Sequence, residues 1–446
     1  MKDRILVWCW RNFRWLFLLI GWFAISIILL LYYSSPFVFS EISKTKLLPG
    51  ALIDGHYQIE ENCNACHSPF DGVPQSSCLN CHASELEAIN DSHAISKFKD
   101  PRNAAKLTKI NALECKSCHD DHEPDLVTSL GVTVEDRFCI HCHAKISDDR
   151  PSHSEFKFDK CRQCHNYHDN KALYEDFVKK HLDEPKNLQK TTILKRNFRE
   201  IYPKLLLRSN KSLNTENHNG PLDSDSKVVQ EWANSKHARS GVNCRDCHVS
   251  EEAEWTLKPE VIVCQNCHGL EIKSFLESRH GMRLNQKNLS PMTPRFARLA
   301  MKSDSFEKEL NCNTCHGAHE YDTKFAQVES CLECHDDDHS LSYKKTPHFK
   351  IWNSKENSNK MGVSCSGCHL ARREAKARGL RYVYVDHNQN NTLRPNQKMV
   401  RPICMNCHGL GFSLDALSDR NLIKNNFSGV PVSHLSITEM VKARIK

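Results

Sequence analysis

A single five-residue pattern recurs eleven times in this 446-residue chain: cysteine, any two residues, cysteine and histidine. It uses 22 of the 23 cysteines and leaves only Cys9 outside. The cysteine pairs are Cys63 and Cys66, Cys78 and Cys81, Cys115 and Cys118, Cys139 and Cys142, Cys161 and Cys164, Cys244 and Cys247, Cys264 and Cys267, Cys312 and Cys315, Cys331 and Cys334, Cys365 and Cys368, and Cys404 and Cys407. The histidines that complete the pattern are His67, His82, His119, His143, His165, His248, His268, His316, His335, His369 and His408.

This pattern is the attachment signature of c-type haem, in which two thiols bond to the macrocycle and the adjoining imidazole takes one axial face of the iron. Zinc sites also use paired cysteines, but they need two further ligands and no histidine directly after each pair. Disulfide scaffolds and thioredoxin-like sites do not require that histidine either. The sequence therefore predicts eleven covalently attached haem c groups.

Haem iron has a second axial face, and a histidine outside the motif is the usual ligand for it. Eleven such candidates accompany the eleven motifs: His56, His93, His122, His153, His168, His237, His280, His319, His339, His348 and His387. His122 and His168 each follow a motif histidine by three residues, which is too close to reach the same iron. We therefore expect each of these two to serve another haem.

Composition indicates that the cofactors replace a conventional core. Hydrophobic residues make up 39% of the chain, and the mean hydropathy is −0.57. The predicted fold class is therefore mainly α with extensive coil, built as a haem-cored multihaem cytochrome whose apo chain does not fold. The formal charge of +7 is offset by two propionates on each haem, so the basic side chains are expected to pair with propionates rather than with nucleic acid.

The N-terminus predicts a membrane anchor. Residues 1–14 carry four basic side chains, and residues 15–33 form an uncharged apolar run with aromatic residues at both ends. That length suits a transmembrane helix, and the basic flank suits a cytoplasmic segment. A cleaved signal peptide, the alternative, would have a shorter apolar run and a cleavage site of small residues. The predicted location is the bacterial inner (cytoplasmic) membrane, with one membrane-spanning helix and the haem modules in the periplasm.

Motif spacing predicts two haem modules. Residues 54–180 hold five motifs that begin 15, 37, 24 and 22 residues apart, and residues 227–417 hold six. Residues 181–226 contain no motif and are interpreted as a junction, and residues 418–446 as a tail. A small hydroxyl residue stands two positions before His237, His280 and His348, which suggests an internal repeat.

The second module resembles the hydroxylamine oxidoreductase-like multihaem superfamily. The matching features are His319 three residues after His316, His339 after the motif at 331–335, and the hydroxyl-x-histidine settings. The first module is similar to class III-type multihaem cytochromes, with His56 seven residues before Cys63 and a close motif pair. The superfamily includes electron carriers and catalysts with one open iron. Its nitrite reductases often carry lysine in the catalytic attachment motif, and no such motif occurs here.

The histidine inventory favours an electron-transfer protein over an enzyme, because a catalytic haem keeps one axial face open. The predicted function is an electron conduit between a membrane donor or acceptor, such as the quinol pool or a respiratory complex, and a periplasmic redox protein. Two alternatives stay open: an oxidoreductase of the hydroxylamine, nitrite or sulfur-oxyanion type with one open-coordinate haem, and a quinol dehydrogenase. No catalytic residue is predicted.

Overall fold

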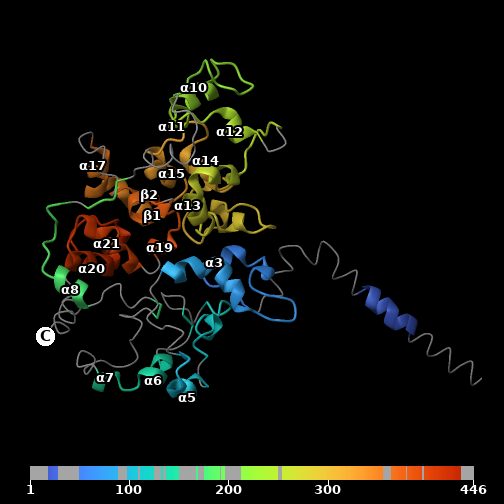
Figure 1. The fold of residues 1–446 in the computed structure, drawn as a ribbon, viewed down its shortest axis with the longest axis vertical. Helices are drawn as coiled ribbons and strands as arrows, with labels where there is room; N and C mark the ends of the chain where they lie inside the picture. The colour runs from blue at the N-terminus through green and yellow to red at the C-terminus, as the bar shows by residue number, and fades with distance from the viewer. Residues whose placement is uncertain are drawn as a thin grey trace, which may run out of the picture.

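A computed structural model describes residues 19–28, 50–88, 98–108, 111–124, 132–133, 137–149, 167–168, 175–190, 192–195, 212–249, 254–354, 363–377, 379–393 and 396–432. Within these ranges the secondary structure consists mainly of short helices and single 3₁₀ turns joined by coil. Figure 1 shows α10–α12 and α5–α7 at opposite ends of the molecule.

The helices that precede the predicted second module are brief, and the longest of them carries the motif at 78–82. They are α3 (Gln75–Ala88), α5 (Ala104–Leu107), α6 (Arg137–His143), α7 (Ile146–Asp149) and α8 (Glu175–His181), with the 3₁₀ turns η2 (Tyr57–Ile59), η3 (Cys63–Ala65), η4 (Pro101–Asn103) and η5 (Cys115–Ser117). Residues 19–28 are also helical.

The second half repeats this organisation. Its helices are α10 (Lys227–Asn234), α11 (Lys236–Arg239), α12 (Cys244–His248), α13 (Gln265–Leu276), α14 (Cys312–His316), α15 (Glu329–Leu332), α16 (Asp338–Ser342), α17 (Pro347–Asn353), α18 (Cys365–His369), α19 (Asn390–Leu393), α20 (Leu410–Ser418) and α21 (Arg420–Lys424). Its 3₁₀ turns are η8 (Val261–Cys264), η9 (Met282–Asn285), η10 (Pro294–Phe296), η11 (Ser303–Ser305), η12 (Phe325–Gln327), η13 (Tyr343–Lys345), η16 (Asn396–Met399) and η17 (Cys404–Asn406).

The predicted transmembrane helix requires a correction to both the fold class and the location. No helix in the described ranges has the length and apolar character needed to cross a membrane. Ten helical residues at 19–28 rise about 15 Å, roughly half the thickness of a bilayer's hydrocarbon core. The remainder of residues 15–33, and the basic segment 1–14, lie outside the described residues. The prediction of a single-pass anchor in the inner membrane is therefore wrong on this finding.

The conventional hydrophobic core is small. One cluster of buried residues joins α8 to the C-terminal helices through Val178, Met399, Val400, Leu410 and Leu417. Figure 1 shows α8 beside α20 and α21 accordingly. A second cluster contains only Val229, Trp232 and Ala238. Clusters of this size bury little apolar surface for a chain of this length.

A two-stranded antiparallel hairpin interrupts the helical pattern. Strand β1 (Arg372–Ala377) pairs with β2 (Leu380–Val385), with Arg372 opposite Val385, and Gly379 adopts a φ of +78° in the turn. Arg373 Nε donates to Asp386 Oδ2 at 2.5 Å, and Asp386 is 1% exposed. This ion pair anchors Asp386, which follows the end of β2 and precedes His387.

The N-terminal part of the predicted pentahaem module (residues 54–180) packs directly on the predicted hexahaem module (residues 227–417). Gln58 Nε2 donates to the Arg279 carbonyl at 2.7 Å, and the Arg283 guanidinium donates to the Gln58 carbonyl at 2.8 Å. Asn62 Nδ2 also donates to Gln286 Oε1 at 2.8 Å. These contacts join η2 to η9, far from the junction segment at 181–226.

Candidate haem sites

At three motifs the residue before the first cysteine caps the helical turn that the motif forms. The Asn243 and Asn311 side chains each form a capping box at the start of α12 and α14, and the Ser364 hydroxyl accepts from the Gly367 amide at 3.0 Å. Within the turn the histidine amide bonds back to the first cysteine carbonyl, at 2.9 Å for His335 and 2.9 Å for His408. Residues three and four apart lie on one face of a helix, so two thiols and an imidazole point the same way.

Several motif thiols are buried in surroundings of low polarity. Burial raises the pKa of Cys66 and Cys247 to about 11. Burial also raises the pKa of Cys368 and Cys404 to about 12. A thiol turned into a low-polarity interior faces the kind of surroundings that a porphyrin requires.

Nine motif histidines each face a histidine from elsewhere in the chain. The ring centroids are 5.8 Å apart for His82 and His56, 6.4 Å for His67 and His122, 6.4 Å for His119 and His168, 6.1 Å for His268 and His237, 6.1 Å for His248 and His319, 6.3 Å for His335 and His280, 6.4 Å for His316 and His387, 5.9 Å for His369 and His339, and 6.2 Å for His408 and His348. No two pairs share a ring.

This spacing fits a metal ion held between two imidazoles. An imidazole nitrogen bonds a transition-metal ion at about 2.0–2.1 Å, and the ring centre lies roughly 1.1 Å behind it, so two axial rings would have centroids about 6.3 Å apart. Direct contact between rings, as in the pair of His237 and Tyr321, brings centroids to 4.4 Å. The wider separation in the histidine pairs leaves the room that an iron and its porphyrin need.

Hydrogen bonds to Nδ1 orient several of these rings. The acceptor is a backbone carbonyl for His122 (Gly50, 3.1 Å), His248 (Thr256, 2.7 Å), His339 (Ile423, 2.5 Å), His387 (Val385, 2.9 Å) and His408 (Lys186, 3.1 Å). An acceptor at Nδ1 holds the proton there and leaves the Nε2 lone pair available to a metal. The chemistry of the donor set therefore fits haem iron.

Burial keeps the innermost imidazoles neutral, which is the form that can bind iron. It lowers the pKa of His280 to about 4, and it lowers the pKa of His369 to about 4. The Gln389 amide lies 2.9 Å from His280 Nδ1. With the amide Nε2 toward His280, the Gln389 Oε1 atom is buried and has no hydrogen-bond partner. Rotating this amide would let Oε1 accept the His280 Nδ1 proton, as ligation through Nε2 requires.

Each predicted distal histidine in the described ranges faces a motif histidine. His122 faces His67, and His168 faces His119. His93, His153 and His165 lie outside the described residues, together with Cys161 and Cys164. The axial ligands of the motifs at 139–143 and 161–165 therefore stay predictions, as does ligation of iron by all of these residues.

The hydroxyl residues that stand two positions before three of the predicted distal histidines have a structural role. Ser235 and Thr346 are N-caps that accept from the Ala238 and Phe349 amides. The Ser278 hydroxyl accepts from the His280 amide at 3.1 Å. The exposed fractions of these three residues are 3%, 0% and 0%. Each buried hydroxyl therefore starts the turn that presents a distal histidine.

Replacing Thr346 with alanine removes the cap of α17, which carries His348. We expect the free energy of unfolding to fall by about 1 kcal/mol, the usual cost of losing an N-cap. Urea denaturation of the holoprotein, followed by circular dichroism, measures the change. Thr346→Ser keeps the hydroxyl and is expected to retain most of the stability. Equal losses in both variants would contradict a capping role.

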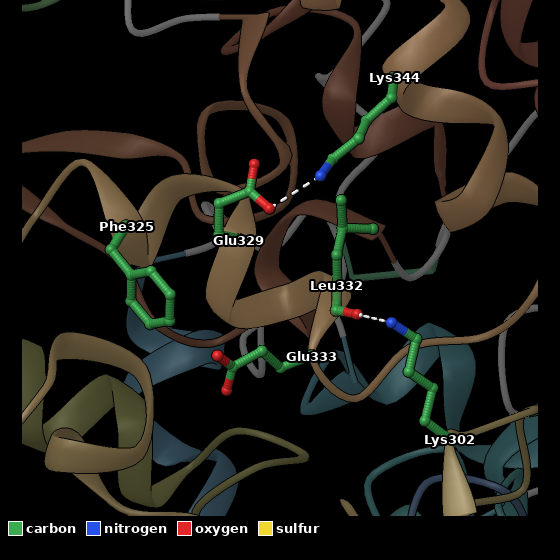
Figure 2. A pocket seen from close by; sticks show the side chains of 6 residues that line it. All are labelled: Lys302, Phe325, Glu329, Leu332, Glu333 and Lys344. Carbon is green, nitrogen blue, oxygen red and sulfur yellow. Dashed lines mark hydrogen bonds and ion pairs between the residues drawn. The ribbon is translucent and has the colours of Figure 1, made fainter. Parts of the chain in front are cut away.

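A cavity of about 360 Å³ borders the motif at 331–335, and it is lined by Lys302, Phe325, Glu329, Leu332, Glu333 and Lys344. Figure 2 shows that both lysines are engaged within the protein: Lys344 pairs with Glu329 at 2.9 Å, and Lys302 Nζ donates to the Leu332 carbonyl at 2.6 Å. These contacts brace the motif turn from its flank. Leu332 and Glu333 are the two variable residues of that motif.

Comparison with known proteins agrees with this chemistry. The Cytochrome c3 family model matches residues 236–323 and 304–381. A curated relative, the high-molecular-weight cytochrome c of Nitratidesulfovibrio vulgaris Hildenborough, is 22% identical over 353 residues, which cover 78% of this chain and 53% of the relative. The chain thus spans about half the length of the curated relative it matches. No solved structure matches the chain.

The motifs and the two matches define the chain as a multihaem c-type cytochrome that binds haem c covalently. The cytochrome c3 match falls in the second module, whereas the sequence suggested a class III-type resemblance for the first. The hydroxylamine oxidoreductase-like resemblance of the second module stays a prediction.

Sequence reasoning missed the residues that contact the imidazoles from outside. Asp121 Oδ1 lies 2.8 Å from His56 Nδ1, and Glu85 Oε2 lies 3.0 Å from His82 Nδ1. Glu85 follows its histidine by three residues within α3, a spacing that the sequence does show. Asp121 reaches His56 from 65 residues away, and no local signal could have identified it.

Proposed function

We propose that this cytochrome conducts electrons along a row of eleven haems, one for each attachment motif. The observation that carries the proposal is the set of nine histidine pairs at 5.8–6.4 Å. Two strong axial ligands keep a haem low-spin and six-coordinate, so the iron rearranges little when it gains or loses an electron. Haem, when bound, supplies this reversible one-electron chemistry, and the chain supplies both ligands and the order of the sites.

Contacts between cysteines of different motifs support a continuous row. The Cys78 side chain lies beside that of Cys115, Cys264 lies beside Cys312, and Cys331 lies beside Cys365. Electrostatic interactions further couple Cys247 with Cys264, Cys315 with Cys331, and Cys404 with Cys368. In the second module these contacts connect all six motifs in their sequence order. Attachment points this close would hold neighbouring macrocycles within tunnelling range.

A direct contact also supports a passage between the modules. Glu277 interacts electrostatically with both Cys81 and His82. The same segment continues through Arg279, whose carbonyl accepts from Gln58, to His280. His82 of the pentahaem module thus lies next to the segment that carries His280, the proposed second ligand of the iron bound to His335. We propose that electrons cross between the modules here.

Electrons need a donor and an acceptor at the two ends of this row. We propose that one end exchanges electrons with a quinol pool or a membrane redox complex, and the other with a soluble redox protein. Net transfer in either direction is compatible with reversible one-electron sites.

Spectroscopy of the purified holoprotein tests the proposal. We expect a covalent haem content of eleven per chain, low-spin ferric signals in electron paramagnetic resonance, and full reduction by a low-potential donor without binding of cyanide or nitrite. A ferric high-spin signal from one haem, with rapid ligand binding, would instead support an enzyme with an open iron. A haem content well below eleven would contradict the continuous row.

A further inference from the structure

One of the nine histidine pairs has a carboxylate beside both of its rings. His56 Nδ1 lies 2.8 Å from Asp121 Oδ1, and His82 Nδ1 lies 3.0 Å from Glu85 Oε2. The side chains of His56 and Asp121 are 28% and 29% exposed, and that of Glu85 is 28% exposed. The side chain of His82 is 47% exposed, so the site is partly shielded from water, and a hydrogen bond to a charged acceptor keeps part of its strength there.

The other oriented pairs differ in the acceptor. Five pairs have a backbone carbonyl at Nδ1 of one ring, namely those that contain His122, His248, His339, His387 and His408. A carbonyl is neutral, whereas both carboxyl groups at the pair of His56 and His82 are ionised at neutral pH. This pair therefore has two anionic acceptors where each of the five has a neutral one.

The acceptor at Nδ1 affects the iron through the ring. A carboxylate draws the Nδ1 proton toward itself and makes Nε2 a stronger electron donor. A stronger donor stabilises ferric iron more than ferrous iron, which lowers the reduction potential, and hydrogen bonding around the ligands is one of the ways in which a protein sets that potential. Two carboxylates act in the same direction.

Further anionic charge faces this site from neighbouring elements. Asp121 interacts electrostatically with Cys66, Cys78 and His82, and Glu277 of the hexahaem module interacts with Cys81 and His82. The basic groups that act here, Lys398 and Arg373, interact with Glu85. The two carboxylates are hydrogen-bonded to the rings themselves, whereas these two cations act on Glu85.

We propose that Asp121 and Glu85 are positioning residues that give the haem between His56 and His82 a lower reduction potential than the five haems whose axial histidines bond to carbonyls. The proposal rests on the proposed function in requiring an iron between these two rings. Reduction takes one electron from the external donor and changes no bond or proton at the site. A haem of low potential at the contact between the modules would stay oxidised until the neighbouring haems had been reduced.

A potentiometric titration of the full holoprotein with dithionite tests this assignment. The ferric low-spin signal of the pair of His56 and His82 should persist to lower potential than the signals of the five pairs with carbonyl acceptors. Asp121→Asn keeps the size of the side chain and removes its charge. We expect it to make reduction of that haem about tenfold more favourable, a shift of about 59 mV for one electron. Glu85→Gln should act likewise, and the double variant should shift the potential further.

Controls separate this effect from net charge and from loss of the haem. Asp71→Asn removes one exposed charge in the same module, and it should leave the potential of that haem unchanged. Asp121→Glu should restore most of the wild-type potential. An equal shift in Asp71→Asn, or no shift in Asp121→Asn with the haem still low-spin, would overturn the assignment. Missing haem or a high-spin signal in the wild type would instead contradict the proposed function.

Discussion

Replacing His280 with alanine is expected to turn one low-spin haem into a high-spin one. His280 faces His335 with centroids 6.3 Å apart, and its pKa of about 4 shows how fully the protein buries it. Without its imidazole, the iron on His335 would keep one protein ligand and an open face. Electron paramagnetic resonance should then show one high-spin ferric centre, and cyanide should bind to it.

The same substitution should slow electron transfer between the modules. His280 directly follows Arg279, which contacts Gln58 of the pentahaem module, and Glu277 of the same segment interacts with His82. We expect the rate constant for reduction of the second module, measured by stopped flow, to fall by about tenfold or more. A loss of this size is usual when the surroundings of a metal ligand are disturbed. His218→Ala is the matched control, since His218 contacts Ser224 at 3.3 Å and belongs to none of the nine pairs. A spectrum unchanged by His280→Ala would contradict the assigned ligand.

Replacing Arg283 with methionine should cost about 3 kcal/mol of unfolding free energy. Arg283 is 5% exposed, and it donates to the carbonyls of Gln58 at 2.8 Å and Ser290 at 2.9 Å. Its guanidinium also lies 3.7 Å from the Glu61 carboxylate. Removing it would leave a half-buried carboxylate and two carbonyls without their donor, which is among the most costly kinds of substitution. Urea denaturation, followed by circular dichroism and by the haem spectrum, measures the loss.

Arg298 provides the matched control at the same contact. Its guanidinium pairs with Asp54 at 2.9 Å and lies over the Tyr57 ring, but its side chain is 42% exposed. Exposed ion pairs contribute little, so Arg298→Met should cost less than about 1 kcal/mol. Equal destabilisation of both variants would contradict the view that the buried hydrogen bonds of Arg283 stabilise the contact between the modules.

The attachment chemistry could be predicted from sequence because it is local. Five consecutive residues bring together the two thiols and the first axial ligand, and no distant contact is needed. The set of distal candidates could also be predicted, since few histidines stand outside the motifs. The partner of each could not: His248 faces His319, 71 residues away, and not His237, which is eleven residues before it. Only the tertiary arrangement determines such pairs.

Other features lacked a local signal. The hairpin at 372–385 contains several charged residues with weak strand preference, and Arg373 of its first strand forms an ion pair with Asp386, which is buried. The predicted junction at 181–226 gave no indication that residues near Gln58 would contact residues near Arg283. The apolar run at 15–33 predicted a membrane-spanning helix, whereas the described helix covers residues 19–28. In the hairpin, the tertiary structure departed from the weak strand preference of the isolated segment.

The histidine pairs have a topological consequence once each holds an iron. Every pair then closes a loop, as a disulfide does, and a loop of 71 residues such as 248–319 restricts the unfolded chain by about 4 kcal/mol in the entropic model. The loops interlace: His280 lies inside 248–319 while its partner His335 lies outside, and 316–387 overlaps 280–335 and 348–408 in the same way. Each of the loops between residues 237 and 408 therefore shares part of the chain with another, so ligation of one iron also restricts the neighbouring loop.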